Sequence, residues 1–160
     1  MARPACALAL AISIGLAGAG AGALRPPPSS AQGFDDPFAG LAAVREQVPV
    51  RVPPRALAVI PERHLGRRLL LVDELDGFEP QFDDVARGLG LSLTNAIQLR
   101  TKEARLPVFV PKTEETIATL LQVPVGTRLG LTGLVVTRAG RYLFLASDVR
   151  PASRSRRRRR

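Results

Sequence analysis

The sequence has few of the residues that build covalent or metal-held frameworks. Its 160 residues contain one cysteine, one histidine, one tyrosine and no tryptophan. A disulfide framework needs pairs of cysteines, and a zinc cluster needs several cysteine or histidine ligands. We therefore expect no disulfide scaffold, no bound metal and no cofactor. The 14 prolines and 14 glycines argue against a helical bundle and favour a fold rich in strands and loops.

Catalytic constellations are also scarce. His64 is the sole imidazole that could act as a base, and no serine stands in a nucleophile-elbow context. Acidic residues gather between Asp73 and Asp84, but an EF-hand register that places Gly77 at the sixth loop position puts Val72 at the first. That loop therefore lacks its first ligand. We predict that the protein is not an enzyme, and we expect a solvated acidic loop. An irregular cation site and an enzyme of unknown type are the alternatives.

The N-terminal residues 1–31 have the pattern of a secretory signal peptide. Arg3 precedes an uncharged stretch of about 20 small and apolar residues, and a cleavage site follows before Gln32 or, earlier, after Ala23. We predict export to the periplasm or beyond, with no integral membrane span after cleavage. Because a stretch of this length can just cross a bilayer, an uncleaved N-terminal anchor with the domain outside the cytoplasm is the alternative.

The net charge of +9 is concentrated at the C-terminus. Residues 32–149 hold 14 basic and 14 acidic side chains, so this region is neutral as a whole. The excess lies in residues 150–160, which a run of like charges keeps solvated, and we predict a disordered tail there. Such a tail could associate with nucleic acid, anionic lipid or acidic glycan. Its basic residues are Arg150, Arg154, Arg156, Arg157, Arg158, Arg159 and Arg160.

Residues 32–65 precede the main domain. Asp36 and Pro37 suit the start of a short helix. Prolines recur from Pro49 to Pro61, and this frequency predicts an extended linker without a regular helix, with a short edge strand at Ala56–Ile60.

Residues 66–149 read as one domain with a defined order of elements. The patterns predict a strand at 67–75, the turn "DGFEP", a short helix or ordered loop at 81–90, strands at 91–101 and 105–111, a helix after 112, and a hairpin over 127–149. Thr113 can cap the second helix, whose apolar stripe is Ile117, Leu120 and Leu121. Gly140 suits the tight turn of the hairpin.

This order resembles an oligonucleotide/oligosaccharide-binding (OB) fold of the kind found in exported bacterial proteins. The resemblance rests on "GRRLLLVDEL" as the opening strand and on "VFVPKTEETIATLLQVPVGTRLGLTGLVVTRAGRYLFLASDVRP" as strand, helix, strand start and closing hairpin. It implies a mainly β fold with one short helix, in which five strands close a barrel and the helix lies between the third and fourth. Another small β-barrel or an α+β domain is the alternative.

The resemblance implies ligand binding across the second and third barrel strands. The candidate residues on that face are Ser92, Thr94, Gln98, Arg100, Arg105 and Phe109, with core packing as the alternative role for Phe109. We therefore expect an exported, non-enzymatic binding module whose barrel takes an envelope protein or an oligomeric ligand. The alternative is a protein that contacts polyanions through its arginine tail. Few aromatic residues are available for base stacking, which disfavours nucleic acid on the barrel.

Overall fold

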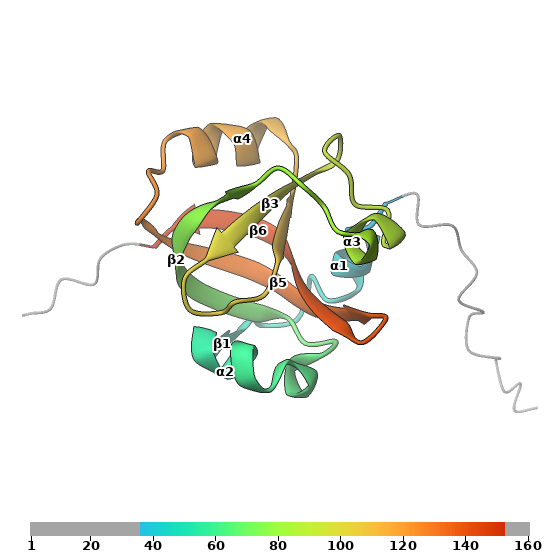
Figure 1. Ribbon diagram of the computed structural model, residues 1–160. Coiled ribbons are helices and arrows are strands. Elements are labelled where there is room, and N and C mark those ends of the chain that lie inside the picture. Colours follow the sequence, from blue (N-terminus) through green and yellow to red (C-terminus); the bar gives the residue numbers. More distant parts are fainter. Residues whose placement is uncertain (1–35, 153–160) are drawn as a thin grey trace, which may run out of the picture. The chain divides into compact units, whose positions relative to one another are not determined.

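The computed structural model describes residues 36–152 (Figure 1). The predicted signal peptide at 1–31 and the tail residues after Ala152 lie outside the described residues. The elements are α1 (Ala39–Ala43), β1 (Val50–Val52), α2 (Pro54–Val59), the 3-10 helix η1 (Pro61–His64), β2 (Leu69–Glu79), α3 (Asp84–Gly88), β3 (Ala96–Thr101), β4 (Val108–Pro111), α4 (Glu114–Leu121), β5 (Arg128–Arg138) and β6 (Arg141–Pro151). No helix within residues 36–152 is long and apolar enough to cross a membrane.

Five strands close a barrel, and β1 extends the sheet as a sixth strand. The strand order is β1-β2-β3-β4-β6-β5, and β2 also pairs with β5, which closes the ring. The β4–β6 pair is parallel, whereas the other barrel pairs are antiparallel. With α4 between β4 and β5, this is the OB arrangement, so the predicted mainly β fold class and the OB-like architecture are confirmed.

Strand β2 closes the barrel because it is long enough to pair on both sides. Residues Leu69–Glu74 pair with β5, and the strand then pairs with β3 from Leu75 to Glu79, with a register shift between Leu75 and Gly77. The predicted turn at "DGFEP" was therefore wrong, because Gly77 and its neighbours continue the strand past the irregularity. A glycine inside a strand is typical of such a local bend.

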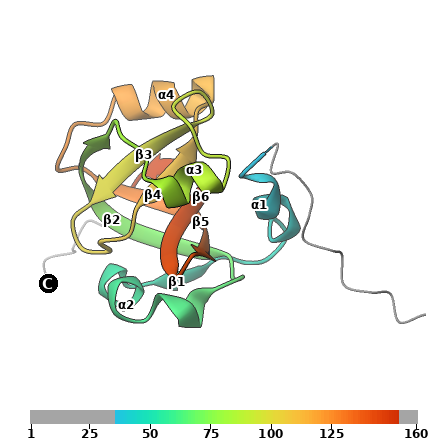
Figure 2. The same cartoon turned by 45° about the vertical axis from the view of Figure 1, so that its right-hand side comes forward.

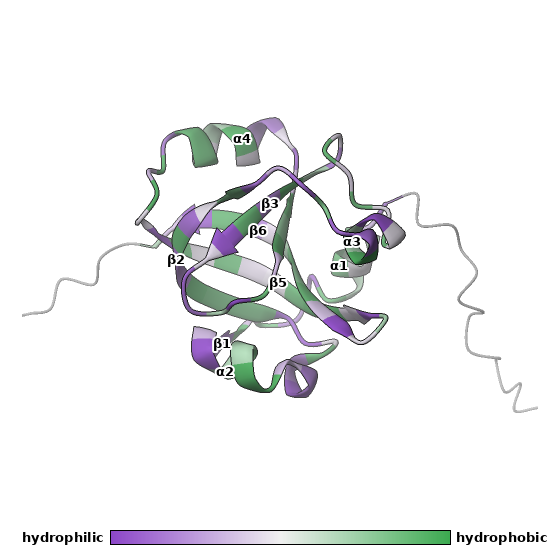
Figure 3. Cartoon of the chain, viewed as in Figure 1, coloured by the Kyte–Doolittle hydropathy of each residue, from purple (hydrophilic) through white to green (hydrophobic). Residues whose placement is uncertain are grey.

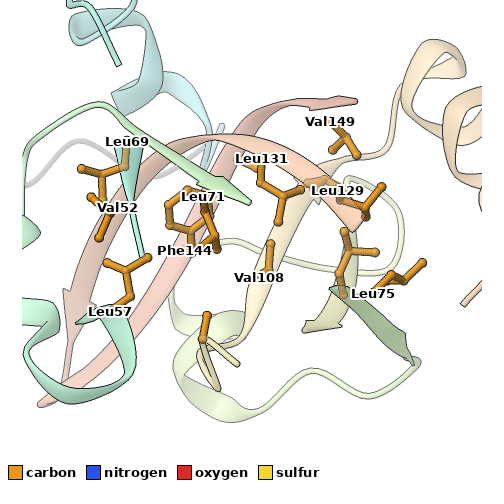
Figure 4. Close-up of a cluster of buried hydrophobic side chains, with 14 of the residues drawn as sticks. Val52, Leu57, Leu69, Leu71, Leu75, Val108, Leu129, Leu131, Phe144 and Val149 are labelled. Carbon is orange, nitrogen blue, oxygen red and sulfur yellow. The ribbon is translucent and has the colours of Figure 1, made fainter. Parts of the chain in front are cut away.

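The barrel interior is a continuous apolar core (Figure 4). Alternate residues of β2 point inward, among them Leu69, Leu71 and Leu75, which are fully buried. Phe144 of β6 is equally buried and packs among them. Hydrophobic residues accordingly follow the barrel strands, whereas the tip of the β5–β6 hairpin is hydrophilic (Figure 3).

A second apolar cluster lies on the outside of the barrel, beneath α1 and α3, which share one side of it (Figure 2). Phe109 of β4 contributes to this cluster together with outward-facing residues of β5 and β6. The ring of Phe82, just before α3, meets the ring of Phe109 edge-on, with centroids 5.2 Å apart. Helix α1 and the segment that carries Phe82 and α3 therefore cover part of the outer barrel surface.

The proline-rich segment contains a strand and two helical turns instead of an extended linker. The expected edge strand at Ala56–Ile60 was wrong, since β1 lies earlier and α2 occupies Pro54–Val59. Pro54 stands in the first turn of α2, where proline has no helical hydrogen bond to lose. Leu57 of α2 is fully buried, and this burial anchors the helix on the barrel.

The structure tests three predictions for helix caps and turns, at Thr113, Gly140 and Asp36. Thr113 caps α4, because its side chain accepts a hydrogen bond from the Thr116 N–H, but Leu121 is 82% exposed and leaves the predicted apolar stripe. Gly140 has a φ of +74°, as the tight hairpin turn requires. The Asp36 side chain accepts from the N–H of Phe38, and α1 begins after this turn.

Candidate binding groove

Three neighbouring hollows follow β3 and the β3–β4 loop. The central hollow has a volume of about 410 Å³, and its charged lining consists of Asp76, Glu79, Arg100, Lys102 and Arg105. Its lining includes parts of β2, β3 and the loop that follows β3. Strand β3 is the second barrel strand, so this hollow lies along a strand that the resemblance associates with ligand binding.

Arg100 is held in place by two carboxylates of β2. Its Nε lies 2.6 Å from Asp76 Oδ2, and its Nη1 lies 2.8 Å from Glu79 Oε1. The hydrogen bond and the charge of Asp76 are the main causes that raise the pKa of Arg100, with Glu79 adding to them. The guanidinium also lies over Gly77, where an added Cβ would be 3.4 Å from Nη2. The charge of Arg100 is thus balanced by two carboxylates within the lining of the central hollow.

Lys102, which also lines the central hollow, is paired with a different carboxylate of β2. Its Nζ lies 3.0 Å from Glu74 Oε1, and this hydrogen bond is the main cause that raises the pKa of Lys102. Both partners of the pair remain partly exposed. Such surface pairs stabilise a protein little but keep a cation at a defined place.

Arg105 differs from these cations, since it makes no ion pair with any residue of the described range. Its backbone is left-handed, with a φ of +54°, which is uncommon for a residue with a Cβ. The residues just before it in the loop are anchored. The buried Asp73 carboxylate accepts the N–H groups of Glu103 at 3.1 Å and Ala104 at 2.8 Å, and Ala104 is fully buried. Arg105 follows these anchored residues directly and is exposed at the central hollow.

Two buried polar atoms of β3 have no hydrogen-bond partner among the described residues. They are Gln98 Oε1 and Thr101 Oγ1, and both residues line the central hollow. Most buried polar atoms in proteins are paired, so these two atoms are exceptions in this part of the barrel. The exposed Arg105 lines the same hollow and marks it as the candidate site.

The central hollow continues into a neighbour at each end. One neighbour, which we call the apolar hollow, shares Glu79 and Gln98 with the central hollow, and its further lining includes Phe78, Pro80, Leu93 and Ile97. The other neighbour, which we call the α2 hollow, shares Lys102 and Arg105 with the central hollow, and its further lining is Arg55, Ala58, Val59 and Glu103. We call the three together the β3 groove.

The structure brings only part of the predicted barrel site together. Gln98, Arg100 and Arg105 meet in the central hollow. Ser92 and Thr94 lie in the turn before β3, where their hydroxyls are 2.7 Å apart, and they line none of the three hollows. The predicted strand therefore begins later, at Ala96.

Phe109 was wrongly assigned to the ligand face. It is 1% exposed and packs beneath the segment that carries Phe82. Arg150 is likewise not part of a tail, because it lies in β6 opposite Gly130 of β5, and its Nε lies 2.8 Å from Asp148 Oδ2. The other tail residues, Arg154, Arg156, Arg157, Arg158, Arg159 and Arg160, lie outside the described residues.

Sequence reasoning missed Asp73, Lys102 and the contribution of α2. Asp73 falls on the inward side of a strand whose other inward residues are leucines, and this alternation was the available signal for a buried anchor. The carboxylates of the acidic stretch are largely engaged by Arg100, Lys102 and Arg141. Within residues 36–152, no group of three or more potential metal ligands is placed to hold an ion.

Comparisons with known proteins find only distant similarity. No family model and no curated protein sequence matches the chain. A putative aspartyl-tRNA synthetase from Leishmania major is 8% identical with a TM-score of 0.45, over 66% of this chain and 21% of that one. An OBody bound to hen egg-white lysozyme is 10% identical with a TM-score of 0.40, over 59% and 88%. A replication protein A heterotrimer bound to single-stranded DNA is 8% identical with a TM-score of 0.38, over 53% and 57%.

The chain spans about a fifth of the length of the synthetase that it resembles. Similarities of this size carry no information on the ligand. The strand topology defines the fold, and the contacts of residues 36–152 define the candidate site.

Proposed function

We propose that the chain is a non-enzymatic binding module that takes an extended, oligomeric ligand in the β3 groove. The observation that supports this most directly is Arg105, an exposed cation without an ion pair within residues 36–152, whose left-handed backbone follows directly on the residues that Asp73 anchors. A left-handed residue with a side chain costs about 1–3 kcal/mol, and it persists where the surrounding structure enforces it, often at functional sites.

The outer face of β4 around Phe109 is covered by the protein's own segments. Phe109 and the neighbouring apolar side chains are covered by α1 and α3. The Arg141 Nη1 group of the hairpin lies 2.8 Å from Asp83 Oδ2, which ties the covering segment to the β5–β6 hairpin. A ligand on that face would have to displace a packed apolar cluster, whereas the β3 groove is open.

The groove is tested by exchanging Arg105 for asparagine in the full chain. Asparagine tolerates the left-handed backbone and carries no charge, so the loop is preserved. With labelled heparin, a single-stranded oligonucleotide and six-residue peptide pools as probes, we expect at least one to bind and to lose threefold or more in affinity, as for an exposed charge contact. Fluorescence anisotropy measures this loss. The exposed Arg63, which lines none of the three hollows, provides the control Arg63→Gln. Unchanged affinity of Arg105→Asn for every probe would contradict the proposal.

The arginine tail is the second candidate, supported by the six arginines that follow Ala152. A deletion can separate binding through the tail from binding in the β3 groove. It must begin at residue 153, because β6 extends to Pro151 and the Ala152 N–H donates to the Arg128 carbonyl at 2.8 Å. Binding through the tail falls steeply with salt and disappears with the deletion. Binding in the β3 groove survives the deletion.

We also propose that the protein is exported, on the signal-peptide pattern of residues 1–31. Cleavage before Gln32 would remove the segment and leave the barrel outside the cytoplasm. N-terminal sequencing of the protein from the exported fraction is expected to begin at Gln32. A membrane-bound product that still begins at Met1 would instead support the anchor, and a cytoplasmic product would contradict export.

A further inference from the structure

We propose that the β3 groove accommodates an extended peptide segment of a partner protein, with an apolar side chain at one end and a carboxylate at the other. This inference rests on the proposed function and identifies the class of ligand. It follows from the order of chemical groups along the groove. Glu79 and Gln98 join the central hollow to the apolar hollow, and Lys102 and Arg105 join it to the α2 hollow.

The three hollows therefore form a series along β3 and the loop that follows it. The six residues of β3 alone extend over about 20 Å at the usual rise of a strand. An extended peptide of about six residues matches this strand in length, because its own rise per residue is similar.

The apolar end presents large side chains that the fold leaves uncovered. Phe78 is 47% exposed and Leu93 is 57% exposed, and both line the apolar hollow with Pro80 and Ile97. Clustered exposure of this kind is typical of contact surfaces. Lys112 lies beside them, but its Nζ donates to the Leu93 carbonyl at 2.7 Å and so helps hold the wall. An apolar side chain is the group that this end fits.

The opposite end is suited to a carboxylate. Arg105 has no ion-pair partner within residues 36–152, and Arg55 of α2 makes only an exposed pair with Glu103, at 3.3 Å. Both arginines line the α2 hollow. Arginine binds carboxylates with two parallel hydrogen bonds, so an acidic side chain or a chain end arriving here would find a vacant partner.

The middle of the groove favours a peptide over a nucleic acid. Asp76 and Glu79 already balance Arg100, and a regularly charged phosphate backbone would have to pass these two carboxylates. A peptide backbone is uncharged, so it can pass these two carboxylates without charge repulsion. No aromatic side chain lines the central or the α2 hollow within the described residues, so bases find no stacking partner there.

The test uses the full chain and labelled six-residue peptide pools. In each pool leucine and glutamate stand at opposite ends, in both orders, and the positions between them are mixed. Matched pools replace leucine by serine or glutamate by glutamine. We expect the glutamine pool to bind at least threefold more weakly than the glutamate pool to the unmodified chain, but equally to Arg105→Asn. We expect the serine pool to lose at least fivefold on the unmodified chain and nothing on Phe78→Ser.

Phe78→Leu keeps an apolar surface and is expected to bind as the unmodified chain does, and thermal unfolding shows whether each variant is folded. If no peptide pool binds, or if binding ignores either Arg105 or Phe78, the peptide proposal is overturned. Oligonucleotide or heparin binding that still depends on Arg105 would then leave the groove as the site and change the ligand class. Independence of every probe from Arg105 would overturn the proposed function itself.

Discussion

Replacing Asp73 by alanine is expected to lower the free energy of unfolding by about 4 kcal/mol, since hydrogen bonds to a buried charged group contribute about 1.5–3 kcal/mol each. Asp73 is 2% exposed, and its carboxylate accepts the N–H groups of Glu74 at 2.7 Å, Glu103 at 3.1 Å and Ala104 at 2.8 Å. Alanine would remove the acceptor of all three donors, of which the Ala104 N–H is buried. Asparagine retains one side-chain acceptor oxygen, so Asp73→Asn should be destabilised less.

Urea unfolding measures both losses, with Asp84→Ala as the matched control. Asp84 carries a carboxylate of the same kind, but its side chain is 95% exposed. Its Oδ1 lies 2.6 Å from Nη2 of Arg87 on the same helix. Its removal is expected to change the stability by less than about 0.5 kcal/mol. A loss below about 1 kcal/mol for Asp73→Ala would show that the loop does not depend on this anchor.

The anchor also connects stability with the proposed site. Asp73 fixes Glu103 and Ala104, and Arg105 follows them directly in the chain. A buried charge is costly unless it is fully hydrogen-bonded, and here its bonds go to the loop that presents the groove cation. The fold thus uses one buried carboxylate to set the position of a surface cation.

The order of the barrel elements could be predicted because it depends on local patterns. Alternating apolar residues identified the hairpin that Gly140 closes, and Thr113 marked the start of α4. The second apolar cluster could not be predicted in this way. Phe109 looks the same in the sequence whether it faces solvent or Phe82, and only the folded chain brings the α3 segment over it.

The groove was only partly predictable for a related reason. Arg100 and Arg105 are both arginines near β3, and the sequence does not reveal that one is neutralised by two carboxylates of β2. Phe78 was not predicted to line the site, because Asp76 and Gly77 beside it are typical of a turn. In the structure the strand bends there and continues to Glu79. Whether a charged side chain has an ion-pair partner, and whether an apolar side chain is exposed, depends on tertiary contacts between distant residues.

The substitution expected to be most damaging is Gly133→Ala in β5. A Cβ at this position would lie 2.0 Å from the Leu145 carbonyl oxygen and 2.7 Å from Ala146 Cα. Both are backbone atoms of β6, next to the register shift between Thr132 and Gly133 that leaves Ser147 unpaired in the ladder. A clash with backbone cannot be relieved by a change of rotamer, so we expect a loss of about 4 kcal/mol or more, or failure to fold.

Gly130→Ala is the matched control on the same strand. The nearest atom to a Cβ there is the Arg150 carbonyl oxygen at 3.7 Å, which is an ordinary contact. Thermal unfolding should therefore place Gly130→Ala within about 1 kcal/mol of the unmodified chain. A similarly mild effect at Gly133 would mean that β6 can move away from β5. The closed ring argues against this, because β6 is also paired with β4 and β5 is also paired with β2, so neither strand can shift without breaking a second ladder.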